Sequence, residues 1–291
     1  MRFLTVIALA CAASLGPRTL VAQRRPISLQ RLGSLDAAGI HESSGVAVSR
    51  RFRGILWTHD DSGGRPRIYA VDTTGMLVAT FVVNGARARD WEDIALGRCP
   101  DDPTGWCLFI GDIGDNDERR TRVVVYVIRE PDPRGARDGD GTVRARAVRV
   151  RYADGPHDAE ALAVTPEGDV VIITKGRQGT ALRYDIGRSA LLGDSVTVTL
   201  QDTLPIRPRF LLAWVTGGAI SPSGARVVIR SYTELHFFRR VGARWEPDGD
   251  ACTLGLIEPQ GEAVDFLDED RVILTSERSL GRDASIHVVR C

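Results

Sequence analysis

The sequence predicts an all-β protein of the β-propeller class, and three observations lead to this prediction. A short motif recurs along the 291 residues, and most copies are followed by two or three further strand-like runs separated by turn signals. Almost no stretch shows the 3.6-residue periodicity of an amphipathic helix. Repeats of about 50 residues with about four strands each are typical of propellers built from four-stranded antiparallel blades.

The recurring motif places a polar or acidic residue and a small or acidic one before an alternating apolar strand. It occurs as ESSGVAVS (42–49), DWEDIALG (90–97), DAEALAVT (158–165) and GEAVDFLD (261–268), and in degenerate form as VTGGAISPSG (215–224). Aligning the apolar parts puts five residues at equivalent positions, namely Ser44, Glu92, Glu160, Thr216 and Glu262. Five inner strands predict five blades. Six blades are the alternative if the long interval between the second and third copies conceals a split unit.

The remaining strands follow these motifs in chain order. They are ILWTH, RIYAVD and LVATFVV in the first unit, CLFIGD, VVVYVI and VRARAVRVRY in the second, VVIITK, ALRYD and VTVTL in the third, RVVIRSY and LHFF in the fourth, and RVILTS and ASIHVV in the fifth. The fifth unit is too short for a full blade, so we expect the N-terminal run PISLQRLGSL to close it. Joining both ends of the chain in one blade removes open sheet edges.

The first residues are predicted to be an export signal. Residues 1–22 combine Arg2, an apolar run over 3–15 that is too short to span a bilayer, and Ala22 at a cleavage point. We therefore expect residues 24–291 to form a single propeller domain in the periplasm or outside the cell, with no transmembrane segment. Cys11 lacks a good lipoprotein box, so a lipid anchor is not expected. The formal net charge of zero does not favour nucleic acid or an anionic membrane as a partner.

Four cysteines remain after cleavage, and an even number in an exported protein favours disulfides. Cys99 and Cys107 bracket a short loop that two adjacent strands can close, so we predict that they pair. Cys252 with Cys291 follows by elimination. No CxxC spacing supports metal binding by these thiols.

Polar residues gather where the inner strands start and the second strands end. These two positions lie on the same face of a propeller, because the strands are antiparallel, so HDDSGG (59–64) and GDIGDND (111–117) are predicted to be walls of one site. Hard oxygen ligands suit Ca²⁺. The predicted ligands are Glu42, Glu92, Asp112, Asn116, Glu160 and Glu262. The alternative for each is structural, because Asp and Gly are common turn residues and a glutamate can cap a strand.

A second group of residues on the same face is predicted to act in catalysis. His59 or Asp60 would serve as general base, which requires hydrogen-bond reach to the attacking water. Lys175, the only lysine among 38 basic residues, would stabilise developing negative charge together with Arg230 and Arg278. The sequence contains no GxSxG, HExxH or phosphate-binding loop, so the mechanisms that use them are disfavoured.

Taken together, HESSGVAVS, LWTHDDSGG, DWEDIALG, FIGDIGDN, DAEALAVT and QGEAVDF resemble a family of exported bacterial propeller proteins, over about residues 36–278. More distantly the chain is similar to phytase-like esterase propellers and to calcium-bearing lactonase and gluconolactonase propellers. That resemblance implies a cation in the central channel and ester or phosphoester hydrolysis at its mouth. The lactonases have six blades, and their complete ligand set is not matched here.

Two functions follow as hypotheses. The first is a Ca²⁺-dependent hydrolase of a small anionic or ester substrate, which includes lactones and phosphoesters. The second is a non-catalytic propeller that binds an envelope protein or a glycan, since a propeller fold alone does not fix function. A redox enzyme with an organic cofactor such as a quinone has only the acidic channel in its favour.

Overall fold

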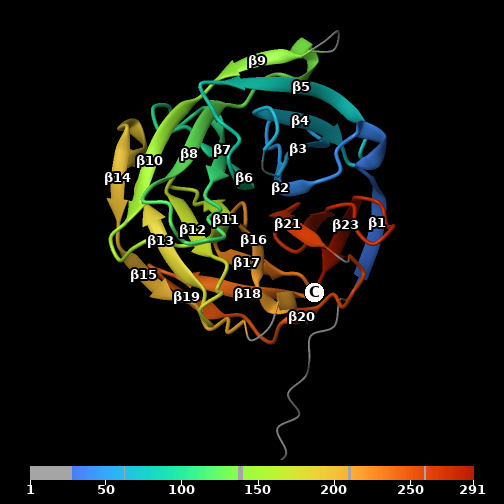
Figure 1. Ribbon diagram of the computed structural model, residues 1–291. Helices are drawn as coiled ribbons and strands as arrows, with labels where there is room; N and C mark the ends of the chain where they lie inside the picture. Colours follow the sequence, from blue (N-terminus) through green and yellow to red (C-terminus); the bar gives the residue numbers. More distant parts are fainter. Residues whose placement is uncertain (1–27, 62, 137–139, 209–210, 259) are drawn as a thin grey trace, which may run out of the picture.

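Five sheets surround one axis in the computed structural model, which describes residues 28–61, 63–136, 140–208, 211–258 and 260–291. The innermost strands are β2 (Ser43–Val48), β6 (Trp91–Arg98), β11 (Ala159–Val164), β16 (Val215–Ile220) and β21 (Gly261–Phe266). Each inner strand contacts the inner strands of both neighbouring blades, so the ring is closed (Figure 1). The prediction of a five-bladed propeller is confirmed, and the six-bladed alternative is not realised.

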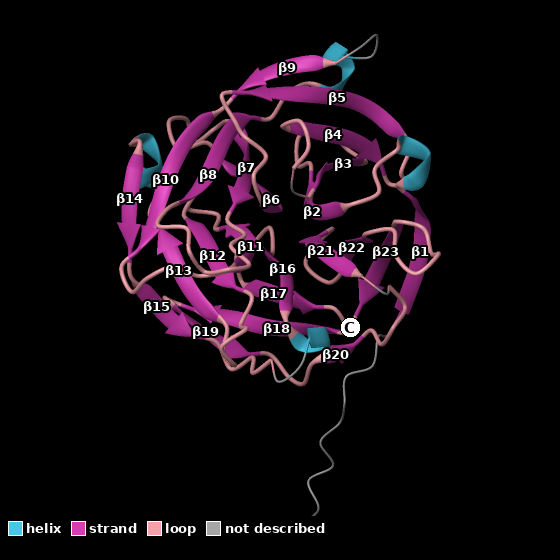
Figure 2. Ribbon diagram, in the orientation of Figure 1, coloured by secondary structure: helices cyan, strands magenta, loops and turns pink. Residues whose placement is uncertain are grey.

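The other strands lie outward from these in each blade. Blade 1 adds β3 (Ile55–Asp60), β4 (Arg67–Asp72), β5 (Leu77–Asn84) and β9 (Gly141–Arg144); blade 2 adds β7 (Trp106–Asp112), β8 (Val123–Arg129), β10 (Arg146–Tyr152) and β14 (Ser195–Val198); blade 3 adds β12 (Val170–Thr174), β13 (Leu182–Ile186) and β15 (Leu200–Thr203). Blade 4 adds β17 (Arg226–Ser231), β18 (Glu234–Val241), β19 (Arg244–Pro247) and β20 (Cys252–Thr253); blade 5 adds β22 (Val272–Ser276), β23 (Ser285–Arg290) and β1 (Ser28–Ser34). Short 3₁₀ turns lie outside the inner ring (Figure 2): η1 (Asp36–Ala38), η2 (Pro133–Ala136), η3 (Arg188–Leu192) and η4 (Leu211–Ala213).

The two ends of the described chain meet in blade 5, as predicted. β1 runs antiparallel to β23, with Ser28 opposite Arg290 and Ser34 opposite Ser285. Figure 1 shows the blue first strand beside the red last strand. The blade therefore joins the two ends of the chain, which makes the ring continuous.

The outer edges of blades 1 and 2 differ from the prediction. VRARAVRVRY is not one strand: it breaks at Ala145 into β9, which pairs parallel with β5, and β10, which pairs with β8. VTVTL likewise divides at Thr199 between β14, parallel to β10 in blade 2, and β15 in blade 3. The alternation of apolar and polar residues identifies a strand but not its partner. The parallel additions cover edges that would otherwise be open.

Large side chains fill the space between blades. Trp91 is fully buried between blades 1 and 2. The centre of its ring lies 5.5 Å from that of the His59 ring, which meets it edge-on, and 6.1 Å from that of the Tyr126 ring. Burial of such a ring stabilises the fold by about 3 kcal/mol. The aromatic residue at the start of this motif is thus part of the packing between blades.

Both predicted disulfides are present. Cys99 is bonded to Cys107, with their Cα atoms 5.0 Å apart, and Cys252 is bonded to Cys291, with Cα atoms 6.1 Å apart. The second bond links β20 of blade 4 to the residue after β23 of blade 5. The predicted signal segment 1–22 lies outside the described residues. Within the described ranges, no helix has the length and apolar character needed to cross a bilayer.

Candidate functional site

All five inner strands carry an irregularity at the same place, next to their first residue. The pairing register shifts between residues 43 and 45, 91 and 93, 159 and 161, 215 and 217, and 261 and 263. The skipped residues are Ser44, Glu92, Glu160, Thr216 and Glu262, which are the five that the sequence alignment made equivalent. A bulge re-aims a side chain that the regular pleat would direct elsewhere. The repeat in the sequence is therefore a repeated bulge at one end of the channel.

The bulged residues serve two purposes. Ser44 donates its hydroxyl hydrogen bond to the carbonyl of Glu92 in the next blade at 2.8 Å, and Thr216 donates to the carbonyl of Gly261 at 3.0 Å. These two residues tie neighbouring blades together. Glu92, Glu160 and Glu262 instead bring carboxyl groups into mutual electrostatic contact, although each is at most 6% exposed.

Further carboxyl groups join these glutamates, and we call the whole set the acidic mouth. Its members are Asp61, Asp90, Glu92, Glu160, Glu262 and Glu277. One carboxylate oxygen from each of Asp61, Asp90 and Glu92 lies within 4.8 Å of the others. Spacing of this kind allows three oxygens to contact one cation.

The loop GDIGDND forms one wall of this cluster through a glycine. A Cβ atom on Gly114 would lie 2.0 Å from Oε1 of Glu92 and 2.5 Å from Oδ2 of Asp90, so only glycine allows the two carboxyls to approach. Arg120 holds the loop in place: it donates to Asp112 at 2.7 Å and to the Gly114 carbonyl at 2.6 Å. These contacts hold the loop beside the acidic mouth.

Lys175, which follows β12, is the cation closest to the glutamates. Its Nζ lies 2.5 Å from Oε1 of Glu160 and 5.8 Å from the ring centre of Trp214. The neighbouring carboxylates raise the pKa of Lys175 despite its burial. The ammonium group therefore stays charged beside Glu160.

One lysine does not neutralise the rest of the acidic mouth. Burial first, and then repulsion from Glu160, Asp61 and Asp90, raises the pKa of Glu92 well above its ordinary value. Burial, and then repulsion mainly from Asp61, raises the pKa of Asp90 to about 6. Burial, and then repulsion mainly from Glu262, raises the pKa of Glu277 to about 9. Burial raises the pKa of Glu160 to about 8 and that of Glu262 to about 7, although Lys175 opposes both shifts. Such a cluster must hold protons or a cation at neutral pH.

Three of the six predicted ligands lie in the acidic mouth, and three do not. Glu92, Glu160 and Glu262 meet at the acidic mouth. Glu42 is exposed on the rim, and its carbonyl accepts a hydrogen bond from the Asp61 N–H at 2.9 Å. The other two face different partners: Asp112 pairs with Arg120, and the side chain of the exposed Asn116 accepts a hydrogen bond from Arg177.

The predicted catalytic residues are mostly dispersed. His59 is fully buried, its Nδ1 lies 2.9 Å from the Asp60 carbonyl, and burial lowers its pKa, so it is neutral and enclosed. The Asp60 carboxylate accepts a hydrogen bond from the Tyr69 hydroxyl at 2.9 Å. Arg278 is exposed, and its backbone N–H donates to the His41 carbonyl at 2.8 Å. Of the five predicted catalytic residues, only Lys175 forms an ion pair with a glutamate of the acidic mouth.

Arg230 is buried within a polar network between blades 4 and 5. Its guanidinium donates to Glu258 and to the carbonyl oxygens of Ala263 at 2.6 Å and Thr275 at 3.0 Å. Glu258 also contacts Nδ1 of His287 at 2.7 Å. Arg230 therefore has a structural role. Its carboxylate partner, Glu258, lies in a loop without any recognisable motif.

Sequence reasoning did not select Asp61, Asp90 and Glu277 as ligands, although each neighbours a selected motif. Asp61 follows Asp60, and Asp90 stands two residues before Glu92. The signal that would have found Asp61 and Asp90 is the pairing of acids at strand ends, whereas Glu277 has no such acidic neighbour. A predicted site should therefore include both members of such a pair.

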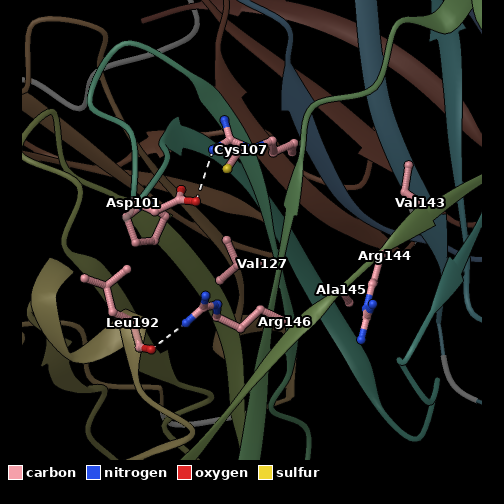
Figure 3. Close-up of a pocket in the computed structure, with 10 residues that line it drawn as sticks. Asp101, Cys107, Val127, Val143, Arg144, Ala145, Arg146 and Leu192 are labelled. Atoms are coloured by element: carbon pink, nitrogen blue, oxygen red, sulfur yellow. Dashed lines mark hydrogen bonds and ion pairs between the residues drawn. The ribbon is translucent and has the colours of Figure 1, made fainter.

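Below the acidic mouth the channel is nearly closed. Apolar side chains of the inner strands, such as Val46, Ile94 and Val264, leave a cavity of only about 20 Å³. Larger hollows lie elsewhere. One of about 440 Å³ lies at the outer edge between blades 1 and 2 (Figure 3), where Arg146 donates to the Leu192 carbonyl. We place the candidate site at the mouth, because the converging carboxyl groups are there and not at the outer edge.

A scan against protein-family models finds no match for this chain, and neither does a search of curated proteins. Among solved structures, it is similar to the PQQ-bound aldose sugar dehydrogenase of Streptomyces coelicolor (12% identity, TM-score 0.53, 90% of this chain and 98% of that one). It is also similar to the apo form of the soluble aldose sugar dehydrogenase of Escherichia coli (12% identity, TM-score 0.51, 90% and 99%) and to a gluconolactonase of Xanthomonas campestris (13% identity, TM-score 0.46, 89% and 91%). At these identities, the likeness to the two dehydrogenases shows that the chain shares the propeller fold.

Proposed function

We propose that this protein is an exported, divalent-cation-dependent hydrolase whose acidic mouth acts on an ester, lactone or phosphoester. The observation that carries the proposal is the set of oxygens from Asp61, Asp90 and Glu92 within 4.8 Å of one another. Two disulfides suit an oxidising compartment outside the cytoplasm.

The residues present fit a hard cation. All donors in the cluster are carboxylate oxygens, and Ca²⁺ accepts six to eight oxygen ligands from such groups and from water. The missing Cβ of Gly114 leaves the room in which Glu92 and Asp90 converge. Asp61, Asp90 and Glu92 would hold the ion, and Glu160 and Glu262 belong to the same charged cluster.

A bound divalent cation would supply Lewis-acid polarisation of a substrate oxygen. The chain's own groups supply the rest. Glu262, with a pKa of about 7 and a hydrogen bond from the Tyr232 hydroxyl, can hold or release a proton at neutral pH. Lys175 can orient a negatively charged or carbonyl oxygen of the substrate.

Cation binding is tested by calorimetric titration of Ca²⁺ into EDTA-stripped protein. We expect saturable binding at one site, weakened at least tenfold in Glu92→Gln and in Asp61→Asn. Binding should be unchanged in Glu246→Gln, an exposed position on β19. Screens with ester, lactone and phosphoester substrates then follow, with and without the ion. Absence of Ca²⁺ binding would remove the cation from the proposal.

The alternative is a binding propeller for an envelope protein or glycan, and one observation favours it. Large apolar side chains are exposed beside blades 4 and 5: Leu211 in η4 is 56% exposed, and Leu256 and Leu280 in loops are 63 and 88% exposed. Arg282 ties two of these loops together by donating to the carbonyls of Leu256 and Ile257. Cation binding without hydrolysis, together with glycan-array binding that is lost in Leu280→Ser, would favour this alternative.

A further inference from the structure

A second concave site lies at the end of the channel opposite the acidic mouth. This site is a cavity of about 420 Å³, lined by residues near the ends of the inner strands. They include Arg50 after β2, Arg98 in β6 and Asp265 in β21. Pockets for small ligands have volumes of about 300–1,000 Å³. We call this cavity the lower pocket.

The lower pocket is separated from the acidic mouth. The space between them is lined by Val46, Ile94, Ala163, Val264 and other small or apolar residues, and it leaves only about 20 Å³. A ligand cannot pass through so small a space. A ligand of the lower pocket must therefore enter from the face opposite the acidic mouth. Its binding does not depend on the proposed function of the mouth.

Two arginines set the charge of the lower pocket. Arg98 lies over the Trp106 ring, with Cζ 4.0 Å from the ring centre, and it donates one hydrogen bond to the Thr104 carbonyl at 3.1 Å. Arg50 donates to the carbonyls of Leu267 at 3.0 Å and Phe266 at 2.5 Å. Among the described residues neither guanidinium forms an ion pair with a carboxylate. Since a guanidinium carries five N–H donors, both retain donors for a ligand.

The single carboxylate of the pocket is already occupied. Asp265 accepts hydrogen bonds from the backbone N–H groups of Val48 and Phe266, both at 2.7 Å. It attracts Arg50 without contacting it closely. Two guanidinium groups against one carboxylate leave the pocket with a net positive charge.

The remaining lining is apolar with two hydroxyl groups. Leu96, Val164 and Ile220 form walls, together with Pro166 and Pro222. Thr165 and Ser221 supply the hydroxyls. A small molecule with an apolar body and a planar anionic group matches this lining, because arginine binds a carboxylate through two parallel N–H···O hydrogen bonds.

We propose that the lower pocket is a binding site for a small organic anion with an apolar body, held by Arg98 and Arg50. The anionic group lies against the two guanidinium groups, and the apolar body lies along Leu96, Val164 and Ile220. The flat face of Arg98 is kept in position by Trp106.

The test is a calorimetric titration of naphthoate into the whole protein, with the neutral analogue naphthyl methanol as comparison. We expect naphthoate to bind at one site and the neutral analogue at least tenfold more weakly, since a charged hydrogen bond contributes at least that much. Arg98→Gln should weaken naphthoate about tenfold. Arg239→Gln, which removes an exposed arginine on β18, is the matched control and should leave binding unchanged.

A second variant does not depend on removing an existing contact. Pro222 is exposed at the pocket edge, so Pro222→Glu adds a negative charge there and should weaken naphthoate binding by a similar factor. Thermal melts confirm that both variants are folded. The proposal is overturned if naphthoate does not bind, if the neutral analogue binds equally well, or if neither variant weakens binding.

Discussion

The acidic mouth should make the cation-free protein less stable as pH rises. The folded-state pKa of Glu262 is raised from 4.5 to about 7 and that of Glu160 to about 8, because burial and neighbouring carboxyls favour the protonated forms. Between the ordinary and the raised pKa the folded state binds more protons than the unfolded state. Stability is therefore fully present below pH 4.5 and is lost as pH rises through the folded-state pKa.

The size of this loss follows from proton linkage between pH 6.5 and pH 8. Ionisation removes about 1 kcal/mol at Glu262 and about 2 kcal/mol at Glu160 over this range. His59 and His236, whose pKa values are lowered by burial, act in the opposite direction, because the unfolded histidines release protons as pH rises. Above pH 6.5 the two histidines together contribute less than about 1 kcal/mol. The net expectation is a loss of at least about 2 kcal/mol, because Glu277, whose pKa is raised to about 9, adds to the loss at Glu160 and Glu262.

Urea unfolding at a series of pH values, in EDTA and in Ca²⁺, measures this loss. We expect the free energy of unfolding to fall across the range in EDTA, and to be flat or rising in saturating Ca²⁺, because an ion that binds only the folded protein stabilises it. Glu160→Gln combined with Glu262→Gln should reduce the slope, and Glu277 should account for part of what remains. Glu269→Gln, at an exposed carboxyl with a lowered pKa, should keep it. A flat or rising profile in EDTA would refute the reasoning.

Three further predictions concern single contacts. Replacing Cys252 and Cys291 by serine should lower the free energy of unfolding by about 4 kcal/mol, from the 39-residue separation that this disulfide spans, as measured by urea titration without reductant. Gly114→Ala should weaken Ca²⁺ binding at least tenfold in calorimetry while the far-ultraviolet circular dichroism stays the same, because the added Cβ enters the space of two carboxylates. Glu258→Gln should cost about 3–5 kcal/mol in urea unfolding, because it leaves the fully buried Arg230 without its anion.

The blade count and the positions of the inner strands could be predicted from the sequence for a physical reason. Each blade must bury an inner strand, so the alternation of apolar residues recurs five times and shows the blade count. The same alignment identified Ser44 and Thr216 as equivalents of the glutamates, and the structure shows that all occupy the same bulge. Local pattern is sufficient here because the bulge is a local feature.

Partners separated along the chain were not accessible in the same way. The alternation in VRARAVRVRY predicted strands correctly, but nothing in it tells that β9 pairs with β5 while β10 pairs with β8. Arg230 ends a second strand as expected, yet its long side chain reaches Glu258 in a loop. An arginine at a strand end can reach several neighbours, so its role depends on distances that the sequence does not contain.

The repeated bulge also explains how one position can differ between blades without harm to the fold. A bulged residue lies outside the regular ladder, so its side chain is not required for pairing. Ser44 and Thr216 use that freedom to bond the next blade, whereas Glu92, Glu160 and Glu262 use it to face one another. Three buried acids in these positions raise the free energy of the empty, ionised site, which serine or threonine would not do. The bulge itself does not require these acids, and the cation proposed above would offset the cost of burying them.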